Sequence, residues 1–470
     1  MSSHTEKIKA CILAPCGPRG GDTIIVDVSC NTTVVLDLSS TNAYLATLTN
    51  MDAFGRLRVS NPFTLFEFSS ILGKNEYLIE ETTSGGGIST HNSPGSYVEM
   101  TVGTGSQSVV RQSREYIMYQ PGKSKLVYLT GVLDVSGSNN TNVTKRIGTF
   151  DSNSGIFVQQ SGTTVSVILR KNSSDSNAIS RSAWIDKLDG TGPSGATVDF
   201  RRAQIFYFDF EWLGVGQVRC GIIQAGRYLP YYVFTHVNAL TEPYIQMAKL
   251  PVRYEIQRSS GGAGTSSMRM ICGTVISEGG FSPIGKVFTY DNFTVANVPQ
   301  INKPTGNNVP SPKYALFAIR PLLTYPKRNI TLKVKAIDIA NAATTALFCW
   351  SLILNPTLSQ TLTYTPYSSI NTTAYATDSA VEVAYGTNDG SSNYVLTSTC
   401  TGGQILKSGF CAGRDSTITF TTTEELVSTL SAGTPLSGTP DTIVLAVNIP
   451  TSSSGSSANV SFAIQWIEIM

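Results

Sequence analysis

The stretch Met51–Glu67 reads M-D-A-F-G-R-L-R-V-S-N-P-F-T-L-F-E, and the interpretation of the chain starts from it. From residue 54 to residue 59, basic and apolar side chains alternate. A period of two is typical of a β-strand, so Leu57 and Val59 are expected on one face and Arg56 and Arg58 on the other. The pattern therefore predicts the first strand of a domain, with one apolar and one basic face.

Pro62 marks the expected end of this strand, because proline has no backbone N–H to donate. Three phenylalanines around it, Phe54, Phe63 and Phe66, are predicted core anchors. Two interpretations of the basic face stay open. In one, the strand is simply pinned to its own domain; in the other, Arg56 and Arg58 pair with acidic groups of a neighbouring subunit, because a guanidinium can bind a carboxylate with two hydrogen bonds.

The longest apolar region, residues 200–233, holds a second strand with two distinct faces. One face carries Ile205, Tyr207, Asp209 and Glu211. The opposite face carries four aromatic residues, and such a row is expected to form the floor of a sandwich core. These predicted core anchors are Phe206, Phe208, Phe210 and Trp212.

The remaining pattern predicts an all-β protein with an N-terminal arm and two antiparallel, jelly-roll-like sandwiches. Short apolar runs alternate with Gly/Ser/Asn-rich turns, and no stretch shows a sustained helical period. Residues 1–50 contain two β-prone runs but too little apolar area for a core, which makes them an arm. Residues 51–297 form the first expected domain. Residues 298–313, rich in Pro, Asn and Gly, form a linker, and residues 314–470 form the second domain.

Composition limits the function classes. Of 470 residues, 41% are apolar and only 14% charged, below the usual quarter, which suits surfaces covered by partners. A net charge of +2 gives no drive towards nucleic acid or membrane, and no apolar run reaches the ~20 residues of a membrane span. The eight cysteines include no C-x-x-C pair, and the N-terminus has no signal-peptide core, so folding in a cytoplasm is expected.

No motif for catalysis, cofactor binding or metal binding stands out. Asp209 and Glu211 could act as the paired carboxylates of a glycoside hydrolase, but no third acid shares their spacing. Acids on strands are more often paired with arginine, and the candidate partners are Arg201, Arg202 and Arg219. Glu278 is expected to pair with an arginine or with backbone N–H groups. Aspartates in the polar loops show no complete calcium pattern, and the sequence contains no nucleophile elbow, P-loop or dinucleotide fingerprint.

The quoted stretch, as D-A-F-G-R-L-R-V-S-N-P-x-T-L-F, resembles the opening of a family of virion structural proteins from tailed bacteriophages and some large DNA viruses. The resemblance covers about residues 51–290. It includes residues 145–155 (K-R-I-G-T-F-D-S-N-S-G), 249–256 (K-L-P-V-R-Y-E-I) and 270–280 (M-I-C-G-T-V-I-S-E-G-G). It implies a structural role in a virus particle and no enzyme.

Three functions follow as hypotheses. The first is a structural component of a virus particle, on the capsid surface, at a vertex, or in a tail or fibre. The second is a carbohydrate- or receptor-binding virion module, with a host surface glycan as partner. The third is a glycan-cleaving enzyme. We expect a homo-oligomer, with a trimer favoured, that contacts other virion proteins and is assembled in the host cytoplasm.

Overall fold

A computed structural model of the chain confirms the all-β fold. It describes residues 23–27, 33–37, 52–54, 56, 58, 61–213, 215–280, 285–292, 299–302, 311–324, 329–341, 346–371, 373, 376–388, 395–411, 417–421, 431–433, 436, 438–451 and 457–469. Every pairing between its named strands is antiparallel. The named helical elements within these ranges are α3 (Tyr367–Ile370) and two short 3-10 turns, Arg181–Ala183 and Ala376–Asp378. No helix there has the length and apolar character that crossing a membrane requires.

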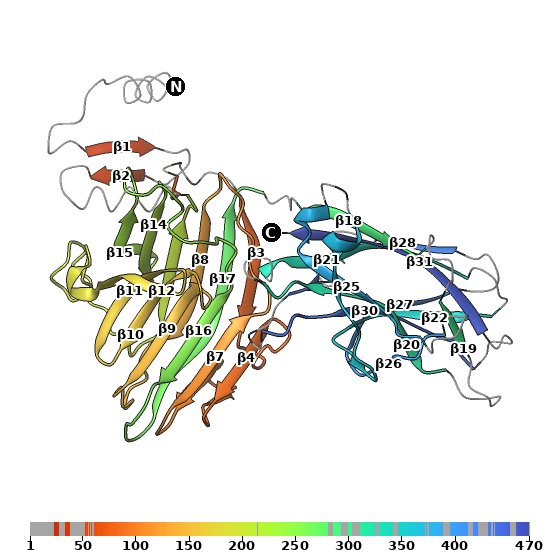
Figure 1. Cartoon of the computed structure of the whole chain (residues 1–470). Helices are drawn as coiled ribbons and strands as arrows, with labels where there is room; N and C mark the ends of the chain where they lie inside the picture. Colours follow the sequence, from red (N-terminus) through yellow and green to blue (C-terminus); the bar gives the residue numbers. More distant parts are fainter. Residues whose placement is uncertain are drawn as a thin grey trace, which may run out of the picture. The chain divides into compact units, whose positions relative to one another are not determined.

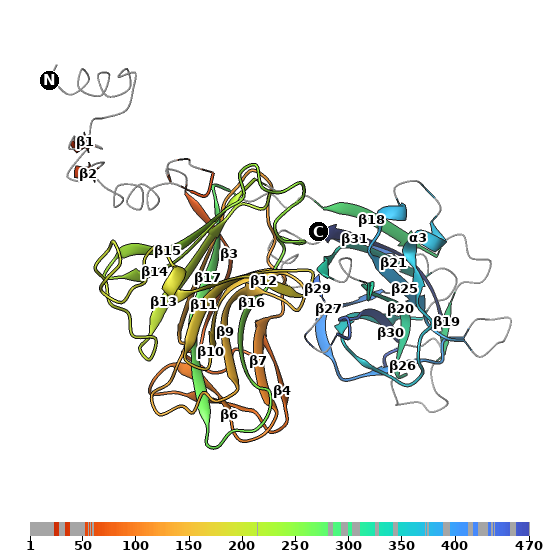
Figure 2. The same cartoon turned by 60° about the vertical axis from the view of Figure 1, so that its left-hand side comes forward.

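The chain divides into two compact units, Met1–Ser113 with Ile117–Phe281, and Arg114–Tyr116 with Ser282–Met470. The first unit is a sandwich of two sheets (Figures 1 and 2). The seven-stranded sheet has the order β12 (Ser174–Ser180), β11 (Thr164–Lys171), β10 (Gly155–Ser161), β9 (Val143–Phe150), β16 (Val252–Arg258), β7 (Gln107–Ser113), β4 (Ile79–Ser84).

The eight-stranded sheet of the first unit is built around the long strand β17. Its order is β15 (Arg227–Thr235), β14 (Gln217–Gln224), β13 (Gln204–Phe210), β8 (Lys125–Val132), β17 (Ser266–Glu278), β6 (Tyr97–Val102), β5 (Ile88–Asn92). The eighth strand, β3 (Pro62–Ser69), pairs with the second half of β17, beyond the part that pairs with β6. This places β3 at an edge, where a proline at the first strand position interrupts no ladder.

Alternation along β13 builds the core between the two sheets. Phe206, Phe208 and Phe210 are fully buried and share one apolar cluster with Ile147 of β9 and Ile256 of β16. Since neighbouring residues of a strand point to opposite faces, the intervening side chains of β13 lie on the outer face of the eight-stranded sheet. The candidate functional site lies on this outer face.

Buried charge on the seven-stranded sheet is paired across strands. Glu255 of β16 lies opposite Arg146 of β9, and its carboxylate accepts hydrogen bonds from Arg146 at 2.5 Å and from Arg253 at 2.6 Å. Burial by itself would raise the pKa of Glu255, but Arg253 and Arg146 outweigh it and hold the pKa below its ordinary value. The ionised carboxylate therefore stabilises the fold.

Glu255→Gln is expected to destabilise the first unit by about 3–5 kcal/mol at pH 7, because two partly buried guanidinium groups lose the buried carboxylate that neutralises them. A depressed carboxyl pKa contributes stability above the unfolded-state value of about 4.3 and loses it as the pH falls through the folded-state value. The difference between wild type and variant should therefore shrink below about pH 4. Thermal unfolding at pH 7 and at pH 3.5 measures this, with the exposed Glu242→Gln as control. An equal difference at both pH values contradicts it.

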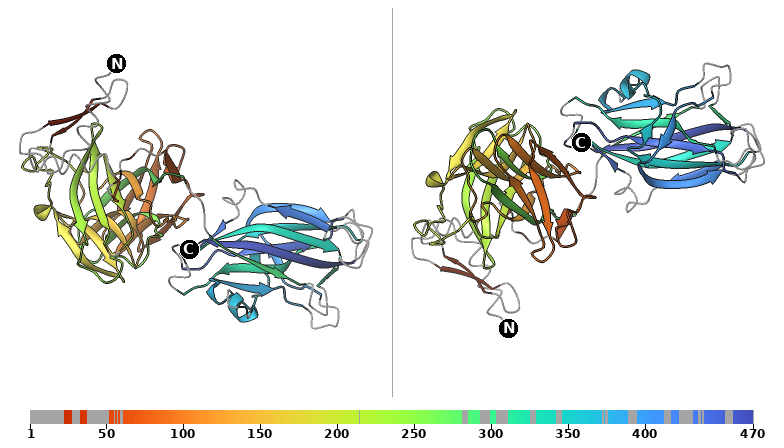
Figure 3. Two further views of the ribbon diagram at one scale, coloured as in Figure 1. Left: turned by 90° about the horizontal axis from the view of Figure 1, so that it is seen from above. Right: turned by 90° about the horizontal axis from the view of Figure 1, so that it is seen from below.

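The second unit is a separate sandwich with its own apolar core around Trp466, Phe317 and Phe462. Figure 3 shows its dark-blue C-terminal strand, β31, running along the unit. The six-stranded sheet contains β18 (Lys286–Asp291), β31 (Ser457–Ile469), β21 (Thr331–Asn341), β28 (Thr417–Thr421), β19 (Gln300–Asn302) and β29 (Ser431–Ala432). The eight-stranded sheet contains β23 (Thr357–Leu358), β26 (Thr399–Thr401), β20 (Lys313–Pro321), β30 (Ile443–Asn448), β22 (Phe348–Leu354), β27 (Gln404–Cys411), β24 (Thr365–Pro366) and β25 (Val381–Tyr385).

The boundary between the units lies earlier than the sequence pattern indicated. Residues 286–291, expected in the first domain, form β18 and pair with β31 of the second unit. Inside the expected linker 298–313, residues 300–302 form β19, which pairs with the same strand. The second unit therefore begins with β18, before the proline-rich stretch, and β19 lies inside that stretch. Both strands belong to the second unit because both pair with β31.

The arm contains one described element, a hairpin of β1 (Thr23–Asp27) and β2 (Thr33–Asp37). Thr23 pairs with Asp37 and Asp27 with Thr33. Within the described residues, each of these two strands pairs only with the other. An isolated two-stranded hairpin is at best marginally stable in water.

Candidate functional site

The described residues immediately before β3 begin with a turn led by Asp52. Asp52 accepts hydrogen bonds from the backbone N–H groups of Phe54 at 3.0 Å and Arg56 at 2.8 Å, a local geometry typical of aspartate-led turns. Its carboxylate also pairs with the Arg56 side chain at 2.7 Å. Phe54, Arg56 and Arg58 lie outside any strand, which corrects the strand expected over 54–59; Leu57 and Val59 lie outside the described residues.

Arg58 joins two strands of the eight-stranded sheet on its outer face. Its guanidinium pairs with Asp209 of β13 at 2.7 Å and with Glu278 at the end of β17. Asp209 and Glu278 are only 2% and 8% exposed, and Arg58 is 20% exposed. Arg58 was a candidate for a subunit interface from the sequence pattern. In the structure, its side chain pairs with two acids of its own unit.

Asp209 is the most constrained acid on this face. The Ser124 hydroxyl donates a hydrogen bond to it, and Arg219 lies 3.6 Å away, as the pairing with an arginine anticipated. Burial raises the pKa of the Asp209 carboxyl, while Arg58, Ser124 and Arg219 oppose that rise. The net effect is a raised pKa, and the carboxyl group lies between two guanidinium groups.

Glu211 has a different partner from Asp209. Its carboxylate accepts a hydrogen bond from the backbone N–H of Gln217 at 3.1 Å, which ties the ends of β13 and β14 together. Burial raises the pKa of Glu211. A glycosidase needs one acid free to donate a proton and a second free to act as base or nucleophile. Asp209 is held by Arg58, so the geometry favours a structural role for both acids.

The other residues singled out from the sequence fall into different places. Arg56 is 53% exposed and pairs with Asp52 of its own chain. Phe66 is buried, and Trp212 packs against the core while partly exposed. Phe63, expected as a core anchor, is 42% exposed near the start of edge strand β3. Phe54 is half-buried.

No group of three metal-ligating side chains occurs in the described ranges. The loop aspartates considered for calcium instead close turns: Asp151 accepts the N–H of Ser154 at 2.8 Å, and Asp186 that of Leu188 at 3.0 Å. The Nδ1–H of His236 donates a hydrogen bond to the Gly216 carbonyl, and its ring stacks on Tyr244. These contacts are structural.

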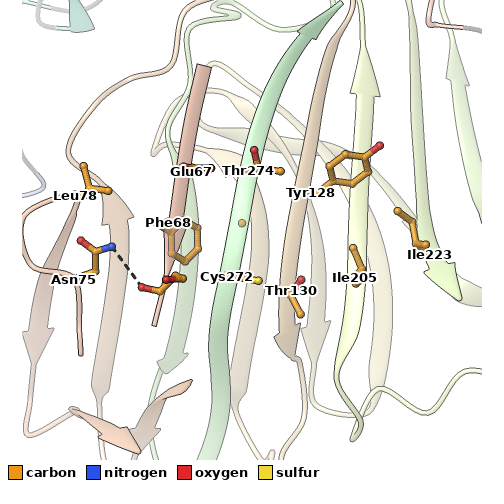
Figure 4. Close-up of a pocket in the computed structure, with 12 residues that line it drawn as sticks. Glu67, Phe68, Asn75, Leu78, Tyr128, Thr130, Ile205, Ile223, Cys272 and Thr274 are labelled. Atoms are coloured by element: carbon orange, nitrogen blue, oxygen red, sulfur yellow. Dashed lines mark hydrogen bonds between the residues drawn. The ribbon is translucent and has the colours of Figure 1, made fainter. Parts of the chain in front are cut away.

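A groove on the same outer face was not recognised in the sequence. It has a volume of about 690 Å³ and crosses strands β3, β17, β8, β13 and β14. Figure 4 shows Glu67, Thr274 and Tyr128 along one side and Thr130 and Ile205 along the other. Its lining also includes Phe68, Ser69, Asn75, Leu78, Ile223, Cys272 and Gly273. Most of the lining residues come from five separate strands and form no local sequence motif, so only the order of the strands in the sheet brings them to light.

Comparison with known proteins gives fold relatives only. No protein-family model matches the chain, and no curated protein matches it. Among solved structures, a legume lectin-like domain from Entamoeba histolytica is 11% identical, with 45% of this chain and 97% of that chain covered and a TM-score of 0.29. A conserved carbohydrate esterase from the Shiga toxin-encoding bacteriophage phi24B is 14% identical, with 47% and 100% covered and a TM-score of 0.29.

An endo-1,3-beta-glucanase from Streptomyces sioyaensis is 9% identical, with 47% of this chain and 98% of that chain covered and a TM-score of 0.31. These neighbours, a lectin-like domain and two carbohydrate-active enzymes, each resemble about half of the chain.

Proposed function

We propose that the chain is a non-catalytic structural component of a virus particle, placed on the capsid surface, at a vertex, or in a tail or fibre. The observation that carries the proposal is the role of the shared motif. Asp52 shapes the turn before β3, and Arg58 neutralises two buried acids of the sheet. The motif through which the chain resembles virion structural proteins therefore stabilises the fold of the first unit. Its Arg58 holds the Asp209 carboxylate in an ion pair.

Assembly through the arm and the exposed sheet edges is part of the same proposal. The β1–β2 hairpin has no described partner outside itself, and β3 is an edge strand with an exposed Phe63. Edges of this kind are normally covered in native proteins, and closed symmetric assembly is one way to cover them. The proposed state is a homo-oligomer, with a trimer favoured, that contacts other virion proteins, takes no cofactor, and binds neither nucleic acid nor membrane.

Purified particles from the source of this sequence should contain the chain at a fixed stoichiometry, measured by mass spectrometry and located by antibody labelling in electron microscopy. Light scattering of the isolated chain should give a multiple of 50.4 kDa. Absence of the chain from particles overturns the virion role, and a stable monomer at high concentration overturns the oligomer. Polysaccharide cleavage that Asp209→Asn abolishes would show that the protein is an enzyme.

The second candidate function, carbohydrate binding, is favoured by the groove on the outer face of the eight-stranded sheet. Carbohydrate binding requires no cleavage of the ligand and is compatible with a structural role.

A further inference from the structure

The floor of the groove is one row of side chains that runs across the sheet. The register aligns five residues on five neighbouring strands: Ser69, Cys272, Thr130, Ile205 and Ile223. All five line the groove. Because strands lie about 4.8 Å apart, this row spans roughly 19 Å. A space of this length suits a linear oligomer lying across the strands.

A second row, one step along the strands, forms an aromatic wall. Glu67, Thr274 and Tyr128 are aligned in it and line the groove. Tyr128 shares a hydroxyl–hydroxyl hydrogen bond with Tyr228, whose ring packs edge-on against Tyr207 at 5.2 Å. These contacts hold the Tyr128 ring in place without a ligand, which lowers the entropy cost of binding.

Tyr207 continues this second row, and Gly221 explains how it fits. A Cβ on Gly221 would lie 2.2 Å from the Tyr207 ring, so only glycine lets the ring lie across β14. The ring is 5% exposed and separates the groove from Asp209, two residues further along β13. Asp209 and Arg58 therefore stay outside the groove.

The lining combines apolar surface with short hydroxyl and amide groups and carries a single charge. Ile205, 37% exposed, and Ile223 supply apolar area, and Thr130 and Thr274 supply hydroxyl groups. No lysine or arginine is among the described residues that line the groove. The Glu67 carboxylate is exposed, and within the described part of the chain no hydrogen bond or ion pair engages it. A carboxylate accepts hydrogen bonds and repels anions, so the complementary ligand is neutral and rich in hydroxyl donors.

We propose that this groove binds a neutral oligosaccharide of several units, lying across β3, β17, β8, β13 and β14. The apolar faces of the sugar rings pack on Ile205 and the Tyr128 ring, and sugar hydroxyls donate to Glu67. Glycoside cleavage takes two carboxylates, and Glu67 is the one charged group of the lining, so the ligand is held and not hydrolysed. This site goes beyond the assembly role and stands whether or not the chain is found in a particle.

Titration calorimetry of the full chain with neutral oligosaccharides of glucose, galactose and mannose, two to six units long, tests the proposal. At least one series should bind, with an affinity that rises with length and levels off once the groove is filled. Oligosaccharides of uronic acids should not bind. Ile205→Lys should weaken binding at least about tenfold, because the ligand must cover an ammonium group. Glu67→Gln should weaken it less, because an amide oxygen still accepts a hydrogen bond.

Ile88→Lys is the matched control, since Ile88 is 57% exposed on β5 of the same sheet and does not line the groove. Its affinity should equal that of the wild type, and circular dichroism should show that both lysine variants are folded. The proposal is overturned if no neutral series binds, if only uronic acids bind, or if Ile205→Lys and Ile88→Lys behave alike. Self-association abolished by Ile205→Lys, without glycan binding, would assign the groove to a protein partner and equally overturn it.

Discussion

Arg58→Ala is expected to destabilise the first unit by about 3–5 kcal/mol, the usual result of removing one partner from a buried ion pair. Asp209 and Glu278 would lose their common counter-charge while remaining 2% and 8% exposed. Arg219, 3.6 Å from Asp209, compensates only in part at that acid. Chemical denaturation of the full chain, followed through the transition of the first unit, measures the loss.

Arg56→Ala is the control for this prediction. Arg56 belongs to the same stretch but is 53% exposed, and exposed ion pairs contribute only about 0–1 kcal/mol. The second unit, with its own core, provides an internal reference because its transition should not move. If Arg58→Ala leaves the first transition unchanged but weakens subunit association, Arg58 acts between subunits after all.

Phe208→Ala is expected to cost about 3–5 kcal/mol, because it removes a large side chain from a site that cannot fully collapse. Phe208 is completely buried between the two sheets and lies in the middle of β13, with β8 and β14 on either side. A protein interior is packed as densely as an organic crystal, so the lost contacts are not replaced. Urea denaturation should show a lower midpoint for the first unit.

Phe63→Ala tests whether this loss reflects burial. The same change at Phe63, 42% exposed on β3, should stay within about 0.5 kcal/mol of the wild type, as is usual at a surface position. Equal losses at the two positions would contradict the assignment of Phe208 to the core. A larger loss of oligomer mass for Phe63→Ala would instead place the edge of β3 in a subunit contact.

Strand content and the inward face of β13 followed from local sequence. An aromatic residue at every second position from 206 to 212 can bury its side chains only as a strand, since period two is the strand period. Phe206, Phe208 and Phe210 accordingly have no exposed surface, and Trp212 at the end of the row is partly exposed. Local alternation predicts which face is apolar, whereas the end of a strand depends on its neighbours.

Local patterns failed where a partner lies far away in the chain. Two β-prone runs, 442–449 and 460–469, are joined by a short Ser/Gly-rich connection, a pattern typical of a hairpin. In the structure, however, β30 pairs with β20 and β22, whereas β31 pairs with β18 and β21 in the other sheet. A short connection can join two neighbouring strands of one sheet as a hairpin, and it can equally carry the chain from one sheet of a sandwich to the other. Likewise, a proline after an alternating run read as a stop, yet Pro62 begins β3, because an edge strand leaves some N–H groups unpaired.

The sequence by itself determined that the chain folds into β-sandwiches and that residues 206–210 enter a core. These properties depend on side chains close together in the sequence. Only the tertiary structure decided that Arg58 meets Asp209 and Glu278, which are 151 and 220 residues away, and that five strands align the groove residues. Strand order and register bring these groups together, and they follow from the packing of the whole unit.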